Sequence, residues 1–98
     1  MHNVYSLLGL CQRAGKLASG EVACEHAVRQ KNAYVILVAE DASDNCKKKF
    51  YNTGVFYQIP VIEFGSKEAL GRAIGKDFRA VLAVTDEGFG KKICELLK

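Results

Sequence analysis

The sequence predicts one α/β domain in which helices and strands form layers. Two uniformly apolar segments rich in β-branched residues, 34–39 and 80–84, have the composition of strands that are covered on both faces. Segments with helical periodicity precede and follow both of them, and the connections are short. The 98 residues suffice for a single core without a metal or a disulfide. Such an alternation of helices and strands is typical of a layered α/β fold.

The first third of the chain contains two predicted helices. Residues 3–14 carry apolar side chains at i, i+3, i+4 and i+7, with Asn3 as the N-cap and Gly15 as the stop. Residues 17–18 are long enough only for a brief edge strand. A second helix is expected over residues 20–31, where Cys24, Ala27 and Val28 turn inward and a basic last turn suits the negative end of the helix dipole. The buried strand 34–39 follows directly.

The middle of the chain continues the alternation. A third helix is expected to begin with Asp41 or Ser43 as its cap, and the segment 52–54, Asn-Thr-Gly, is expected to end it. Residues 59–62 are predicted to form a short strand. Its proline lacks an N–H donor, which favours a sheet edge or the start of a strand.

The last third begins with a short predicted helix over residues 67–74, capped by Ser66. A loop over residues 75–79 leads into the buried strand 80–84. Thr85 or Asp86 then opens a final helix. The sequence contains no linker, repeat or low-complexity segment, so residues 1–98 are expected to form a single domain.

Composition argues against several classes of protein. No run approaches the roughly 20 apolar residues of a transmembrane helix, and the first residues lack the layout of a signal peptide, so a cytoplasmic location is expected. The four cysteines show no Cys-x-x-Cys spacing, which argues against a zinc site and favours buried, reduced thiols. A net charge of +3 permits an anionic partner without requiring one.

Catalytic patterns are weak, and the sequence predicts neither an enzyme nor a cofactor. His26 has no nucleophile and acid at motif spacing around it. Glu40 and Asp41 follow a strand, where α/β enzymes place active groups, but helix capping is the simpler interpretation. The segment 88–92, Gly-Phe-Gly-Lys-Lys, lacks the spacing of a phosphate-binding loop.

Three features suit a polyanion, and each has a structural alternative. The Ser19-Gly20 junction could hold a phosphate at a helix N-terminus, or Ser19 could simply cap that helix. Phe78 lies between two cations in the loop 75–79, so its ring could stack on a base or fill the core below the loop. The run 47–49, Lys-Lys-Lys, could contact nucleic acid or form a solvated helix face.

Five segments together resemble a known family. They are residues 13–16 (Arg-Ala-Gly-Lys), 19–21 (Ser-Gly-Glu), 33–42 (Ala-Tyr-Val-Ile-Leu-Val-Ala-Glu-Asp-Ala), 59–61 (Ile-Pro-Val) and 70–76 (Leu-Gly-Arg-Ala-Ile-Gly-Lys). In this order and spacing they resemble the L7Ae/L30e superfamily of ribosomal proteins, which bind kink-turn RNA, and above all its small bacterial members. The resemblance covers nearly the whole chain.

The resemblance implies a three-layer α-β-α sandwich with a mixed four-stranded sheet. It also implies that the start of the second helix grips the RNA while the loop before the last strand holds an extruded nucleotide. By position, the helix-start set is Gly20, Glu21, Val22, Ala23 and His26, preceded by Ser19, and the loop set is Ile74, Gly75, Lys76, Asp77 and Phe78. The cations expected to contact phosphates are Arg13, Lys16, Arg72 and Lys76.

The chain departs from the family pattern at the helix start. Strong kink-turn binders place Asn and then Glu where this sequence has Val22 and Ala23, whose side chains cannot hydrogen-bond to guanine edges, and a lysine is usual at His26. The expected function is non-catalytic binding of structured RNA, ribosomal or kink-turn-like, with ribosomal proteins as further partners and neither DNA nor membrane. The alternative is a protein-interaction or assembly module of the same fold that has lost RNA readout.

Overall fold

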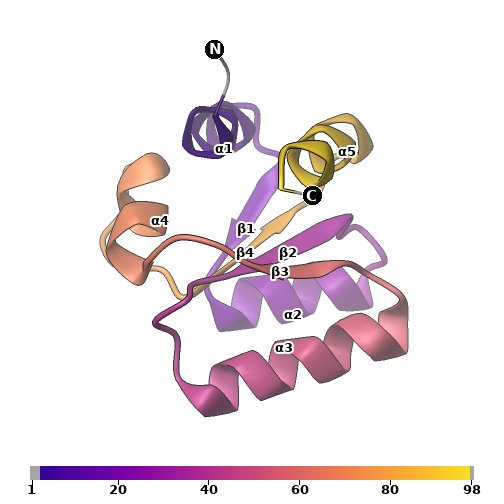
Figure 1. Ribbon diagram of the computed structural model, residues 1–98. Coiled ribbons are helices and arrows are strands. Elements are labelled where there is room, and N and C mark those ends of the chain that lie inside the picture. The colour runs from indigo at the N-terminus through magenta and orange to yellow at the C-terminus, as the bar shows by residue number, and fades with distance from the viewer. Residues whose placement is uncertain (1–2, 98) are drawn as a thin grey trace.

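A mixed four-stranded sheet lies between two layers of helices (Figure 1). The structure is a computed structural model that describes residues 3–97. Within these residues the elements are α1 (Val4–Arg13), β1 (Leu17–Ser19), α2 (Glu21–Arg29), β2 (Val35–Val38), α3 (Asp44–Tyr57), β3 (Val61–Glu63), α4 (Lys67–Ala73), β4 (Val81–Val84) and α5 (Glu87–Leu96). Helices α2 and α3 cover one face of the sheet, and α1, α4 and α5 cover the other (Figure 1). The predicted three-layer sandwich is confirmed.

The strand order is β1-β4-β2-β3, so the last strand of the chain lies inside the sheet. β4 runs antiparallel to both β1 and β2, whereas β2 and β3 are parallel and joined through α3. Every residue of β2 and β4 is buried, because helices cover both of their faces. The two segments predicted as buried strands are therefore the two internal strands, and β1 and β3 are the edges.

The core is apolar throughout. Each helix contributes at least one fully or nearly fully buried side chain to the core, and no buried polar or charged residue occurs among the described residues. The largest of these side chains are Leu8, Val28, Phe50, Leu70 and Ile93. Burial of one such residue stabilises the fold by about 1.5–3 kcal/mol.

Most of the predicted helix caps are present. Side-chain oxygens of Asn3, Ser43, Ser66 and Asp86 each accept a hydrogen bond from the N–H three residues later. Ser43 therefore caps α3, where Asp41 was the alternative. The Asp41 carboxylate instead accepts a hydrogen bond from the Lys67 N–H (2.8 Å) at the start of α4.

The predicted end of α3 is wrong. The segment 52–54 is helical, and α3 continues to Tyr57, where Gln58 adopts the left-handed conformation (φ +59°). Gly54 lies inside the helix because β3 packs directly against it: a Cβ there would lie 2.4 Å from Val61 Cγ2. This glycine allows the helix to approach the sheet closely and does not end the helix.

Candidate nucleic-acid interface

An open groove runs along α2, from the helix start beside the end of β1 to the residues that follow the helix. The residues that line it come from β1, from α2 and the residues that flank this helix, and from the segments before and after β4. They are Leu17, Ala18, Ser19, Gly20, Glu21, Val22, Ala23, His26, Ala27, Gln30, Asn32, Phe78, Arg79, Ala80 and Thr85. Two segments sixty residues apart in sequence, each singled out by its composition, thus form one surface.

The start of α2 has no side-chain cap. Its N-cap is Gly20, at φ +90° and ψ 161°, so the alternative in which Ser19 simply caps this helix is wrong. The Gly20 N–H donates to the Val81 carbonyl (3.0 Å), which fixes this helix end to β4. The N–H groups of the first turn of any helix have no carbonyl partner within the helix, and together with the dipole they favour an anion. Glycine at the cap leaves the backbone accessible at this point.

The loop between α4 and β4 forms the opposite wall. Phe78 is 65% exposed, so its ring does not fill the core, and the stacking alternative remains. Below the loop, Ile74 is buried (6% exposed), and Gly75 makes the turn at φ +73°. The Lys76 N–H donates to the Gly71 carbonyl (2.9 Å), which holds the loop against α4.

Arg79 connects the two walls. Its Nε lies 3.4 Å from Ser19 Oγ, to which it donates, and one terminal nitrogen donates to the Phe78 carbonyl (2.8 Å). In the sequence this cation stands directly after Phe78, but the predicted site does not include it. Its role as a link depends on the pairing of β1 with β4, which no local pattern predicts.

A second, smaller hollow adjoins the groove. It is lined by Glu68, Arg72, Lys76, Asp77 and Phe78, so Phe78 borders both depressions. Arg72 is paired with Glu68 one turn earlier on α4, which offsets part of its charge, whereas Lys76 is exposed. An exposed ring flanked by cations can cover an unstacked base while phosphates are neutralised.

The remaining predicted residues lie at the margins. The Lys16 carbonyl accepts a hydrogen bond from the N–H of Thr85, a lining residue, which places Lys16 beside one end of the groove. Arg13 is the last residue of α1 and lines neither depression. Gln30 and Asn32, which do line the groove, were missed because neutral polar residues at a helix end carry no distinctive signal.

The lysine run 47–49 is on α3 and is not among the residues that line the groove. Lys47 pairs with Glu63 of β3 (3.3 Å), and Lys49 pairs with two glutamates of α2. Two of the three lysines thus form ion pairs between elements. This arrangement favours the structural interpretation of the run.

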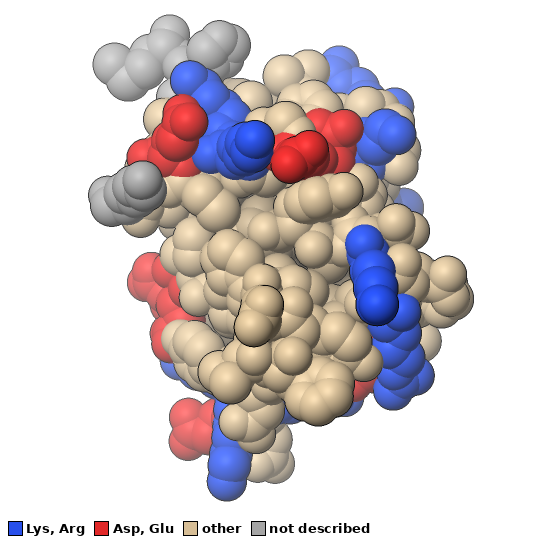
Figure 2. All heavy atoms as spheres, turned by 90° about the vertical axis from the view of Figure 1, so that its right-hand side faces the viewer, with Lys and Arg blue, Asp and Glu red and all other residues tan. Residues whose placement is uncertain are grey.

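The side of the molecule on which α3 ends has a different surface. Figure 2 shows that uncharged residues fill the middle of this face, while Lys, Arg, Asp and Glu lie towards its margins. The C-terminal end of α3 lies on this side (Figure 1), and its Val55 and Phe56 are 81% and 78% exposed. A broad uncharged field attracts a polyanion less than the groove with its neighbouring cations does.

The structure shows no arrangement for metal chemistry within residues 3–97, where no three His, Cys, Asp or Glu side chains are grouped so as to hold an ion. Burial raises the pKa of the Cys24 thiol to about 12, which suits an inert core residue. In the same part of the chain, none of the helices has the length and apolar character needed to cross a membrane.

Three comparisons identify similar proteins. Residues 2–94 match the model of the "Ribosomal protein L7Ae/L30e/S12e/Gadd45 family". The chain is 43% identical over 93 residues to "RNA-binding protein YlxQ" of Bacillus subtilis, covering 95% of this chain and 93% of that protein. It is 40% identical over 93 residues to the protein of the same name from Enterococcus faecium, covering 95% of this chain and 89% of that protein.

Two solved structures have the same fold. A protein of unknown function from Bacillus halodurans superposes with a TM-score of 0.94 at 39% identity, covering 99% of this chain and 98% of the other. The Giardia lamblia 15.5 kD RNA-binding protein superposes with a TM-score of 0.80 at 21% identity, covering 95% and 80%. At that identity, the second likeness concerns the fold alone.

Proposed function

Because the chain belongs to the ribosomal protein L7Ae/L30e/S12e/Gadd45 family, a family of non-catalytic proteins, we propose that it binds structured RNA through the groove at the start of α2. The observation that carries the proposal is the meeting of an uncapped helix start with an exposed aromatic loop in one groove. The names of the two relatives from Bacillus subtilis and Enterococcus faecium support RNA as the ligand.

The groove supplies complementary contacts for a folded RNA. The N–H groups at the start of α2 face a phosphate, and Phe78 covers an unstacked base. Lys76, Arg79 and Lys16 neutralise further phosphates around the groove, with Arg72 contributing less because it is paired with Glu68. Ile74 and Gly75 shape the loop, and Ser19 orients Arg79.

We further propose which kind of RNA the groove binds. A kink-turn or a related bend, in ribosomal RNA for example, suits a groove of this shape, and a ribosomal target would place the protein in the cytoplasm with ribosomal proteins as neighbours. Val22 is 82% exposed at the helix start, and its isopropyl group offers no hydrogen bond to a base edge. Recognition therefore depends on phosphates, shape and stacking more than on base edges.

The test is a binding titration with a kink-turn RNA and an unbent duplex of the same base composition, each over a salt series. We expect tighter binding to the bent RNA, with a log–log salt slope of about −3 to −4 if roughly four phosphates are neutralised. Absence of binding to any structured RNA at low salt would refute the proposal. Equal affinity for both RNAs would refute only its kink-turn part.

A second candidate is a protein-interaction module of the same fold. The exposure of Val22 beside Ala23 favours it, because an apolar helix start could face a protein. Capture experiments from lysates with and without nuclease treatment separate the two functions. Partners that persist after RNA digestion support the protein-interaction module, and partners that disappear support RNA binding.

A further inference from the structure

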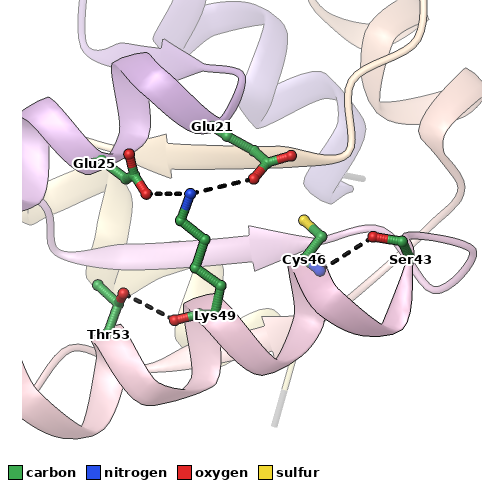
Figure 3. A network of polar contacts seen from close by, with 6 residues as sticks. All are labelled: Glu21, Glu25, Ser43, Cys46, Lys49 and Thr53. Carbon is green, nitrogen blue, oxygen red and sulfur yellow. Dashed lines mark hydrogen bonds and ion pairs between the residues drawn. The ribbon is translucent and has the colours of Figure 1, made fainter.

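A single lysine of α3 bridges two carboxylates of α2. Lys49 Nζ lies 3.5 Å from Glu21 Oε1 and also contacts Glu25 Oε1, as Figure 3 shows. The two glutamates stand one helical turn apart on α2, so one ammonium group reaches both. The hydrogen bond to Glu25 is the largest cause of a raised pKa for Lys49.

One of these carboxylates belongs to the groove. Glu21 is the first residue of α2 and lines the groove at the helix end proposed to receive a phosphate. A free carboxylate there would repel RNA, and it could itself occupy the positive end of the helix dipole. The family resemblance implies that Glu21 is part of the RNA-binding set, yet the charge of its side chain has the wrong sign for contact with a phosphate.

The backbone of α3 is well fixed at Lys49. The Ser43 cap starts α3, the neighbouring Phe50 is fully buried, and the Lys49 carbonyl accepts a hydrogen bond from Thr53 Oγ1 (2.9 Å). Lys48, one residue earlier, is exposed, and in the structure no ion pair joins it to a described residue. The two adjacent lysines therefore carry the same charge but differ in their contacts.

We propose that Lys49 is a positioning residue for RNA binding: it neutralises Glu21 and Glu25 and holds the Glu21 side chain towards α3, so that the helix start stays open to phosphate. The proposal depends on the RNA-binding function proposed above. In it, Lys49 acts through the glutamates and does not touch the RNA. The backbone of Glu21 forms part of the proposed phosphate site, whereas its carboxylate is held away from that site.

The test compares Lys49→Gln with Lys48→Gln, which removes the same charge from the adjacent position. We expect Lys49→Gln to weaken RNA binding about three- to tenfold more than Lys48→Gln, the effect of one unneutralised carboxylate about 4 Å from a phosphate in water. Lys49→Arg should retain most of the affinity. Circular dichroism and denaturant unfolding confirm that each variant is folded under the binding conditions.

The decisive comparison repeats both lysine variants in a Glu21→Gln/Glu25→Gln background. Without carboxylates to neutralise, Lys49→Gln should weaken binding no more than Lys48→Gln does. If Lys49→Gln still weakens RNA binding more than Lys48→Gln does in this background, Lys49 contacts RNA directly. That result would overturn the proposal. Equal losses for the two lysine variants in the wild-type background would also overturn it while leaving RNA binding intact, whereas a wild-type chain that binds no RNA would refute both.

Discussion

Replacing Gly71 with alanine tests whether the loop that carries Phe78 depends on close contact with α4. An ideal Cβ at position 71 would lie 1.4 Å from the Asp77 carbonyl oxygen and 2.5 Å from its carbon. Ordinary contacts begin near 3.4 Å, so the loop backbone must move by about 2 Å. The hydrogen bond from the Lys76 N–H to the Gly71 carbonyl resists that movement.

Two opposing effects set the magnitude for Gly71→Ala. Alanine in a helix is favoured over glycine by about 1 kcal/mol. Overpacking a buried site costs about 1–3 kcal/mol, and a clash with backbone lies at the upper end because no side chain can rotate away. The expected net loss is about 2 kcal/mol in the free energy of unfolding, or roughly 8–16 °C in Tm for a domain of this size.

Urea unfolding and a thermal scan measure the loss of stability. Gly88→Ala on α5 is the matched control, because its Cβ would meet only an Asp86 carboxylate oxygen at 3.3 Å; we expect it to change stability by less than about 1 kcal/mol. At a temperature where Gly71→Ala is folded, its RNA affinity should fall about tenfold, because Phe78 and Arg79 move with the loop. Wild-type stability together with wild-type affinity would show that the loop does not depend on this contact.

Three further outcomes follow from the structure. Lys76→Ala should weaken RNA binding irrespective of base sequence and reduce the magnitude of the salt slope by about one. Titrations over a salt series measure both effects, and the control Lys92→Ala on α5 should show neither. Phe78→Ala should lose about 1–3 kcal/mol of binding free energy. It should lose less than about 1 kcal/mol of unfolding free energy, because the ring is 65% exposed. If paired measurements instead show a large loss of stability with the RNA affinity retained, the ring belongs to the core. Burial raises the thiol pKa to about 11 for Cys11 and about 12 for Cys24, so above pH 9 only the unfolded chain loses these protons. In urea unfolding from pH 8 to pH 10.5, the free energy of unfolding should therefore fall by up to about 1.4 kcal/mol per pH unit for each of these thiols. The fall should be less steep in Cys24→Ala, which lacks one of them.

The parts of the fold that were predicted correctly are those with a local cause. The segments 34–39 and 80–84 are apolar at every position, which only a strand covered on both faces requires, and both are internal strands. The caps Asn3 and Ser66 were predicted because a side-chain oxygen at that position satisfies an N–H of the same helix. The family resemblance, which supplied the sandwich and the sheet composition, is confirmed by the family match over residues 2–94.

The errors have a tertiary cause. Gly54 has the local character of a helix stop, but it is in the helix because Val61 leaves no room for a side chain there. Ser19 has the local character of a cap, but its hydroxyl accepts a hydrogen bond from Arg79, sixty residues away. In both cases a partner distant in sequence decides what the residue does, and no window along the chain contains that partner.

The candidate site likewise combines features that have a local cause with a contact between segments distant in sequence. Composition and resemblance found the helix start and the loop separately, but what joins them is the antiparallel pairing of β1 with β4, which sets Ser19 opposite Leu82. From that register follow the hydrogen bond from Gly20 to Val81 and the reach of Arg79 to Ser19. β1 has only three residues and lies at the sheet edge, so few backbone hydrogen bonds hold the two walls together. The geometry of the groove therefore depends more on this short strand pair than on the stability of the core beneath it.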